Sequence, residues 1–79
     1  MTLQSAILVY PDGDTQEARQ PLRINQVVDL NGFPLQIPLR SDKMIVYTVS
    51  KIRRSESRAE EITYYYLELI NRDEISEYL

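Results

Sequence analysis

Both glycines of this 79-residue chain lie in turn motifs. Gly13 follows Pro11 and Asp12, where proline presets φ and glycine supplies the positive φ that a turn needs. Gly32 follows Asn31, a dipeptide that favours a two-residue type I′ hairpin turn with positive φ at both positions. Segments rich in strand-forming residues precede both motifs. The chain is therefore predicted to fold mainly into β-hairpins.

The segments around these turns have strand patterns. A first strand is expected within residues 3–10, and the polar return segment, residues 15–24, is expected at a sheet edge. Residues 33–39 alternate strictly between apolar and other types, which predicts a strand with one buried and one open face. Pro34 and Pro38 lack N–H groups on the same side of that strand, which predicts an unpaired edge. A short polyproline-like stretch is the alternative.

Residues 44–54 and 60–70 are predicted to form a third hairpin around a polar loop. Charged residues near this loop would pair across the two strands, and each opposite-charge pair contributes about 0.2–1 kcal/mol. The basic residues are Lys51, Arg53 and Arg54, and the acidic residues are Glu60 and Glu61. These charges are expected to help to fix the register.

A helix over residues 59–78 is the alternative for the second half of this hairpin. Ser57 and Glu60 have the spacing of a capping box, and the apolar residues that follow fit a helical stripe. We favour the strand because residues 62–66 are β-branched or aromatic throughout. After them, Asn71 and Glu74 resemble the start of a helix, which predicts a short helix at the C-terminal end.

Together these patterns predict one small domain over residues 1–79. The expected fold is mainly β, a small antiparallel, partly closed barrel or curled sheet of about five to six strands with a short C-terminal helix. Sequential hairpins favour meander connectivity. An α+β sheet with a final long helix is the alternative.

The chain has no cysteine and no histidine, so it can form neither a Cys/His zinc site nor a nucleophile paired with histidine. Asp12 and Asp14 lack the further oxygen ligands of a calcium loop. We therefore expect no enzymatic activity, no metal and no cofactor. The net charge of −3 gives no general attraction to nucleic acid or membranes, and the absence of cysteine and of a signal segment predicts a cytoplasmic protein.

Six tyrosines are the most unusual feature of the composition. In a strand, Tyr64 and Tyr66 share one face with Ile62, while Tyr65 takes the other face. Only one of these faces can meet the core. Either the C-terminal residues Ile75, Tyr78 and Leu79 cover the Tyr64 and Tyr66 face, or that face is free to bind a partner.

The pattern as a whole predicts a non-catalytic protein-interaction or adaptor module that binds a protein partner or a second copy of itself. A single-stranded nucleic-acid-binding small barrel is the alternative, with tyrosines stacking on bases and basic residues pairing with phosphates. The candidate binding residues are Tyr64, Tyr66, Ile62, Lys51, Arg53, Arg54 and Phe33.

Overall fold

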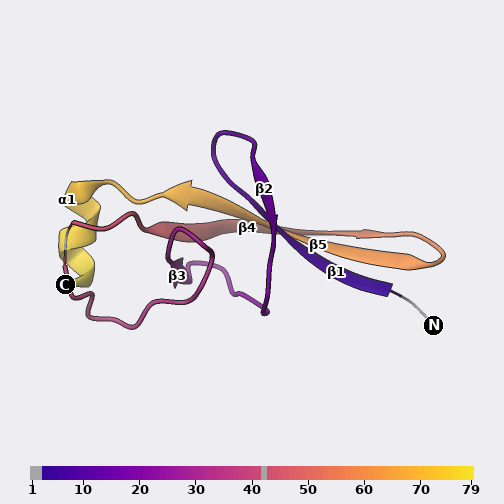
Figure 1. Ribbon diagram of the computed structural model, residues 1–79, viewed down its shortest axis with the longest axis horizontal. Helices are drawn as coiled ribbons and strands as arrows, with labels where there is room; N and C mark the ends of the chain where they lie inside the picture. Colours follow the sequence, from indigo (N-terminus) through magenta and orange to yellow (C-terminus); the bar gives the residue numbers. More distant parts are fainter. Residues whose placement is uncertain (1–2, 42) are drawn as a thin grey trace.

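The computed structural model describes residues 3–41 and 43–79. Within these ranges, five strands form a curled half-barrel sheet, and a short helix follows the last strand (Figure 1). The elements are β1 (Leu3–Val9), β2 (Thr15–Glu17), β3 (Val27–Val28), β4 (Tyr47–Glu56), β5 (Glu60–Leu69), α1 (Arg72–Ile75) and the 3₁₀ turn η1 (Ser76–Tyr78). The predicted mainly β fold with a curled sheet and a C-terminal helix is confirmed.

The strand order is β2-β1-β5-β4-β3, so the first long strand lies beside the last. β1 and β5 run parallel, from the pair Leu3 and Glu60 to the pair Val9 and Tyr66, while the other pairings are antiparallel. The predicted antiparallel meander is therefore wrong at the centre of the sheet. Parallel neighbours need a long connection, and no local turn signal specifies such a pair.

The segment that could have been a strand or a helix is a strand, β5. Its partner β4 contains a β-bulge at Ser50, whose hydroxyl donates to the carbonyl oxygen of Tyr66 at 3.1 Å. A bulge sets two residues opposite one and so shifts the alternation of side chains. As a result, Val49 and Ile52 both pack against the core, although they are three positions apart.

The turn at Asn31 and Gly32 forms, but as a three-residue loop over residues 30–32. The N–H of Asp29 donates to the carbonyl oxygen of Phe33 at 2.9 Å, which closes the loop. Positive φ falls on Gly32, at 83°, and not on Asn31, so the predicted type I′ turn is wrong. The Asp29 side chain stabilises the wider loop by accepting the Asn31 N–H at 2.8 Å.

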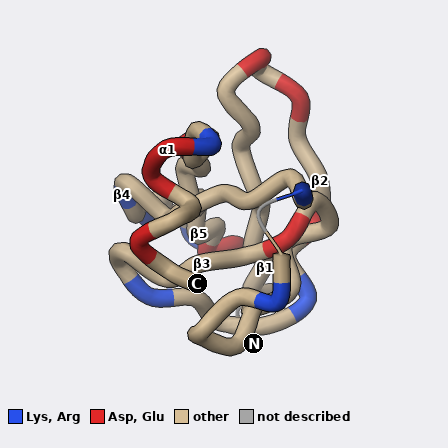
Figure 2. The backbone as a smooth tube through the Cα atoms, turned by 90° about the vertical axis from the view of Figure 1, so that its left-hand side faces the viewer, with Lys and Arg blue, Asp and Glu red and all other residues tan. Residues whose placement is uncertain are grey.

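The turn at Asp12 and Gly13 has the same three-residue form. The N–H of Tyr10 donates to the carbonyl oxygen of Asp14 at 2.9 Å, and Gly13 has a φ of 93°. This loop projects from the body of the protein and carries acidic residues at its tip (Figure 2). The return segment pairs with β1 over three residues at a sheet edge, which confirms the predicted edge position of β2.

Residues 33–39 do not form the predicted strand. The N–H of Leu35 donates to the carbonyl oxygen of Val27 at 2.9 Å. Pro34 forms an isolated bridge with Val28, and the fixed φ of Pro34 and Pro38, about −65°, departs from the φ of about −140° of an antiparallel strand. The predicted buried face is also wrong for half of its members. Leu39 is buried and Leu35 is half-buried, whereas Phe33 and Ile37 are exposed.

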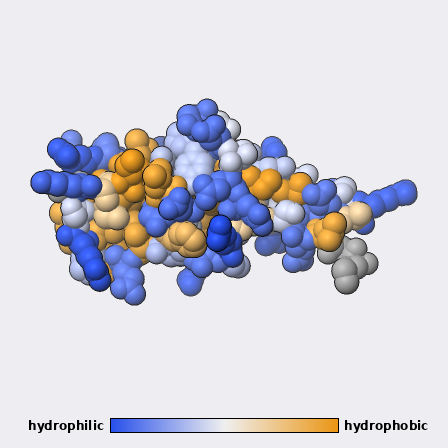
Figure 3. Space-filling view, viewed as in Figure 1, coloured by the Kyte–Doolittle hydropathy of each residue, from blue (hydrophilic) through white to orange (hydrophobic). Residues whose placement is uncertain are grey.

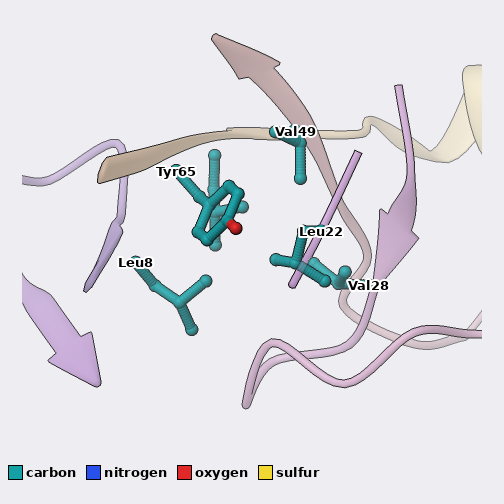
Figure 4. Close-up of a cluster of buried hydrophobic side chains, with 6 residues drawn as sticks. Leu8, Leu22, Val28, Val49 and Tyr65 are labelled. Atoms are coloured by element: carbon teal, nitrogen blue, oxygen red, sulfur yellow. The ribbon is translucent and has the colours of Figure 1, made fainter. Parts of the chain in front are cut away.

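The inner face of the curl carries the main hydrophobic core (Figure 4). Its buried members are Leu8, Leu22, Val28, Val49, Tyr65 and Leu67. β2 and β3 lie at opposite edges of the sheet, so the connecting residues 18–26 must cross it. The burial of Leu22 in this cluster shows that they cross the inner face. Gly32 also lies against Leu8. The inner face around Leu8 and Tyr65 is therefore covered by the chain itself.

A second hydrophobic cluster lies at the helical end of the molecule. Its buried members are Val27, Leu39, Val46, Ile70 and Ile75. Asn71 caps α1 as predicted, because its side-chain oxygen accepts the Glu74 N–H at 2.9 Å. Ile75 and Tyr78 pack into this cluster, while Leu79 stays exposed.

Candidate functional site

The outer face of the sheet carries a row of apolar and aromatic side chains that remain half exposed. Side chains of directly paired residues share a face, so the register assembles this surface from three strands. We call it the tyrosine face, and its members are Ile7 and Val9 from β1, Lys51 and Arg53 from β4, and Ile62, Tyr64 and Tyr66 from β5. In the space-filling view, hydrophobic residues gather at the end of the molecule that carries α1, and smaller hydrophobic patches lie among hydrophilic residues over the strands (Figure 3).

The tyrosine face is distinct from both hydrophobic clusters. Tyr65 points into the core, and strand alternation therefore directs Tyr64 and Tyr66 to the opposite side. The first of the two predicted alternatives is wrong, because the C-terminal residues do not cover this face. Ile75 and Tyr78 pack against the second cluster instead.

Two cations flank the tyrosine rings. The Lys51 ammonium lies 5.6 Å from the centroid of the Tyr66 ring, and the Arg53 guanidinium lies 5.3 Å from that of Tyr64. The rings of Tyr64 and Tyr66 are 6.5 Å apart and tilted by 36°. Contacts of this kind contribute about 0.5–1 kcal/mol at exposed sites. They hold long basic side chains and stiff aromatic rings in one arrangement on an open surface.

The register contradicts part of the charge pairing expected for the β4–β5 hairpin. Lys51 and Arg53 lie opposite Tyr66 and Tyr64 rather than opposite acidic residues. Arg54 faces the inner side, where its guanidinium lies 3.9 Å from the Glu61 carboxylate. Among residues 3–41 and 43–79, this is the one ion pair.

Five of the seven candidate binding residues meet on the tyrosine face, and two do not. Arg54 belongs to the opposite face of the sheet, and Phe33 lies in the loop after β3. Ile7 and Val9 were missed because they reach the face through the parallel β1–β5 pairing. One feature of the sequence could have indicated them. Ile7 and Val9 are apolar and flank the apolar Leu8, so β1 is apolar on both of its faces.

Two hollows lie elsewhere on the surface. An open groove of about 770 Å³ runs along the inner side, between the ion pair of Arg54 and Glu61 and the segment that follows β2. A smaller hollow of about 310 Å³ lies beside the edge-to-face pair of Tyr10 and Tyr47, whose centroids are 5.3 Å apart. Burial raises the pKa of the Tyr10 phenol, with smaller contributions from Tyr47 and Asp29. The Tyr10 hydroxyl donates to the Leu30 carbonyl oxygen at 2.7 Å, and both residues line this hollow.

Metal sites and membrane-spanning helices were also sought in the described part of the chain. There, no three acidic, cysteine or histidine side chains come together in a way that could hold a metal ion. Neither helical segment in the described ranges has the length and apolar character needed to cross a membrane.

Comparison with known proteins places the chain in a family. No curated protein and no solved structure matches it. One family model, described as "Uncharacterised Treponema protein", matches residues 2–78. Because this match covers nearly the whole chain, the protein belongs to the family described as Uncharacterised Treponema protein.

Proposed function

We propose that this protein is a non-catalytic protein-interaction module that binds its partner through the tyrosine face. The observation that carries the proposal is the unequal covering of the sheet. Residues 18–26 and Gly32 cover the inner face, whereas the side chains of Ile62, Tyr64 and Tyr66 belong to neither hydrophobic cluster and stay half exposed. Contiguous apolar surface of this kind on a small domain marks an interaction site.

The composition of the face suits protein recognition. Tyrosine offers a large contact area with little loss of side-chain entropy, and aromatic residues and arginine are enriched at the centres of interfaces. Tyr64 and Tyr66 occupy the central strand, and Arg53 and Lys51 flank them on β4. Because both cations already contact aromatic rings, they are held in place before a partner arrives, which lowers the entropy lost on binding.

Site-specific photo-crosslinking tests this proposal. The photoreactive aromatic residue p-benzoylphenylalanine replaces Tyr66 in one variant and Ile37 in the control, which is 58% exposed but lies in the loop between β3 and β4. Irradiation of cells that naturally produce the chain should give a discrete protein adduct from position 66. The same adduct should disappear when Tyr64→Ala is added. Adducts of equal yield from positions 37 and 66, or none from position 66, would rule the proposal out.

Single-stranded nucleic acid is the second candidate partner. It is favoured by one observation, the placement of Lys51 and Arg53 beside Tyr66 and Tyr64 on an exposed sheet face. It ranks second because the net charge is −3 and because the ring faces that would stack on bases are already occupied by these cations. Glu68 also lies on this side of β5, two positions after Tyr66.

Fluorescence anisotropy separates the two partners. A labelled pool of single-stranded DNA and RNA is titrated with the protein at low and at physiological salt. Nucleic-acid binding through phosphates weakens steeply as salt increases, because bound counterions are released. We expect no binding at either salt concentration. Tight binding at low salt that is lost in the Arg53→Ala variant would replace the protein-partner proposal by the nucleic-acid one.

A further inference from the structure

We propose that the partner of the tyrosine face is a second copy of this chain, packed face to face about a two-fold axis that runs along the strands between β1 and β5. This inference rests on the proposed function and names its partner. It is carried by the pattern of charge and apolar surface across the sheet, which is complementary to itself under one symmetry operation and repulsive under the other.

The register places four side chains in one row across the outer face. Ile7 is paired with Glu17 on one side and with Tyr64 on the other, and Tyr64 is paired with Arg53. The row therefore reads Glu17, Ile7, Tyr64, Arg53 across β2, β1, β5 and β4. It has an acid at one end, a base at the other and apolar surface between them. The next row has the same apolar centre and a base at the same end, and it reads Thr15, Val9, Tyr66, Lys51.

A two-fold axis along the strands exchanges the two flanks of the sheet. β4 of one copy then lies over β2 of the other, and β5 lies over β1. In such an isologous contact each pair occurs twice. Arg53 of each copy meets Glu17 of the other, and Tyr64 packs on Ile7. The central aromatic and aliphatic residues become buried while the charges form the rim, as in other protein interfaces.

A two-fold axis across the strands gives the opposite result. It leaves β4 over β4, so the flank that carries Lys51 and Arg53 faces the same basic flank of the second copy. Like charges brought together in this way repel each other and disfavour the arrangement. The charges thus select one of the two face-to-face dimers.

Neither Arg53 nor Glu17 forms an ion pair with another described residue of the same copy. Arg53 and Glu17 are both exposed and lie on strands separated by three spacings, about 14 Å. The one ion pair within the described residues joins Arg54 and Glu61 on the inner side. An effect of Arg53 on Glu17 would therefore have to arise between copies.

The size of the face predicts a weak dimer. β1 is seven residues long, about 23 Å, and four strands span about 19 Å, so the flat footprint is about 440 Å² on each copy. Stable interfaces bury about 800 Å² on each partner, and smaller ones belong to transient complexes. We therefore expect dissociation in the micromolar range and a mass that depends on concentration.

Charge reversal tests the inference by sedimentation equilibrium. Arg53→Glu sets two acids against each other at both ends of the interface, and Glu17→Arg sets two bases against each other. Each variant alone should dimerise at least about tenfold more weakly than the wild type. An equimolar mixture of the two should form a heterodimer, since position 53 of each chain then meets its opposite charge at position 17 of the other. The double variant Arg53→Glu/Glu17→Arg should regain wild-type dimerisation.

Controls separate this inference from the proposed function. Arg58→Glu, an exposed reversal at the tip of the β4–β5 hairpin, should leave dimerisation unchanged, and circular dichroism should show that every variant is folded. A wild type that stays monomeric at all concentrations, or a mixture that associates no better than either variant alone, overturns the dimer. If position 66 still crosslinks to a different protein, the interaction module survives and only its partner is wrong. If both experiments fail, the proposed function fails as well.

Discussion

The two faces of the β1–β5 pair differ in what covers them more than in what they are made of. On the inner face, Leu8 is paired with Tyr65, and both are buried. On the outer face, Ile7 is paired with Tyr64, and both remain half exposed. Each pair joins one aliphatic residue to one tyrosine. Because side chains alternate along these strands, both faces of the sheet are apolar, and the connecting segments cover one of them.

The path of the chain explains why only one face of the sheet is covered. Residues 18–26 must connect opposite edges of the sheet, and they can cross only one face. Helix α1 packs against the second cluster, around Val46 and Ile70, and not against the outer face. The chain then has no further segment for the outer face within its described residues. Under the proposed function, stability depends on one side of these strands and recognition on the other.

Truncation of adjacent residues on β1 should give the largest contrast between the faces. Leu8→Ala leaves a cavity in the main core, and we expect it to lower the free energy of unfolding by about 3–5 kcal/mol. Ile7→Ala removes a half-exposed side chain from the outer face and should cost about 1 kcal/mol. Urea unfolding followed by circular dichroism measures both. Equal losses would show that the outer face is as much a part of the core as the inner one.

The cover of the inner face can be tested at a glycine. Gly32 has a φ of 83°, and a Cβ atom there would collide with Cδ1 of Leu8. Gly32→Ala should therefore cost about 2–4 kcal/mol, from backbone strain together with overpacking. Gly13 is the matched control, because its φ of 93° is similar but its surroundings are open. Gly13→Ala should cost about 1–2 kcal/mol, from strain alone. Thermal unfolding that shows no difference between them would refute the close packing of this loop on Leu8.

The smallest expected effect is a dependence on pH at the edge of the sheet. Burial raises the pKa of Tyr10 in the folded state, so the folded protein holds this proton more tightly than the unfolded chain. The contribution of Tyr10 to the free energy of unfolding is therefore fully present below the ordinary tyrosine pKa of about 10. It is lost as the pH rises through the higher pKa of the folded state. Urea midpoints between pH 9 and 11 (about the range of tyrosine ionisation) should show this decline. Tyr10→Phe should weaken it, and an unchanged profile in that variant would contradict the assignment.

Much of the fold follows from local features of the sequence. The β-branched and aromatic residues of β5 identify a strand, Gly13 and Gly32 mark both hairpin loops, and Asn71 caps the helix. Each of these signals acts between residues close in sequence. The same holds for the shared face of Tyr64 and Tyr66, which follows from strand alternation alone.

What escapes prediction depends on contacts between distant segments. The parallel β1–β5 pair adds Ile7 and Val9 to the tyrosine face, and no turn signal announces it. The bulge at Ser50 changes which residues of β4 face outward, because one extra residue reverses the alternation. Residues 33–39 have the pattern of a strand, but the fixed φ of their prolines differs from that of an antiparallel strand, and one isolated bridge forms.

The most direct test of the account is urea unfolding of Tyr64→Ala, of Tyr66→Ala and of the double variant that combines them. If the tyrosine face serves binding, each substitution should cost no more than about 1 kcal/mol, and the double variant should fold with its circular dichroism spectrum unchanged while the crosslink from Ile62→p-benzoylphenylalanine disappears. A loss of about 3–5 kcal/mol for either tyrosine, comparable with a buried aromatic residue, would show that the face is structural and would contradict the central claim.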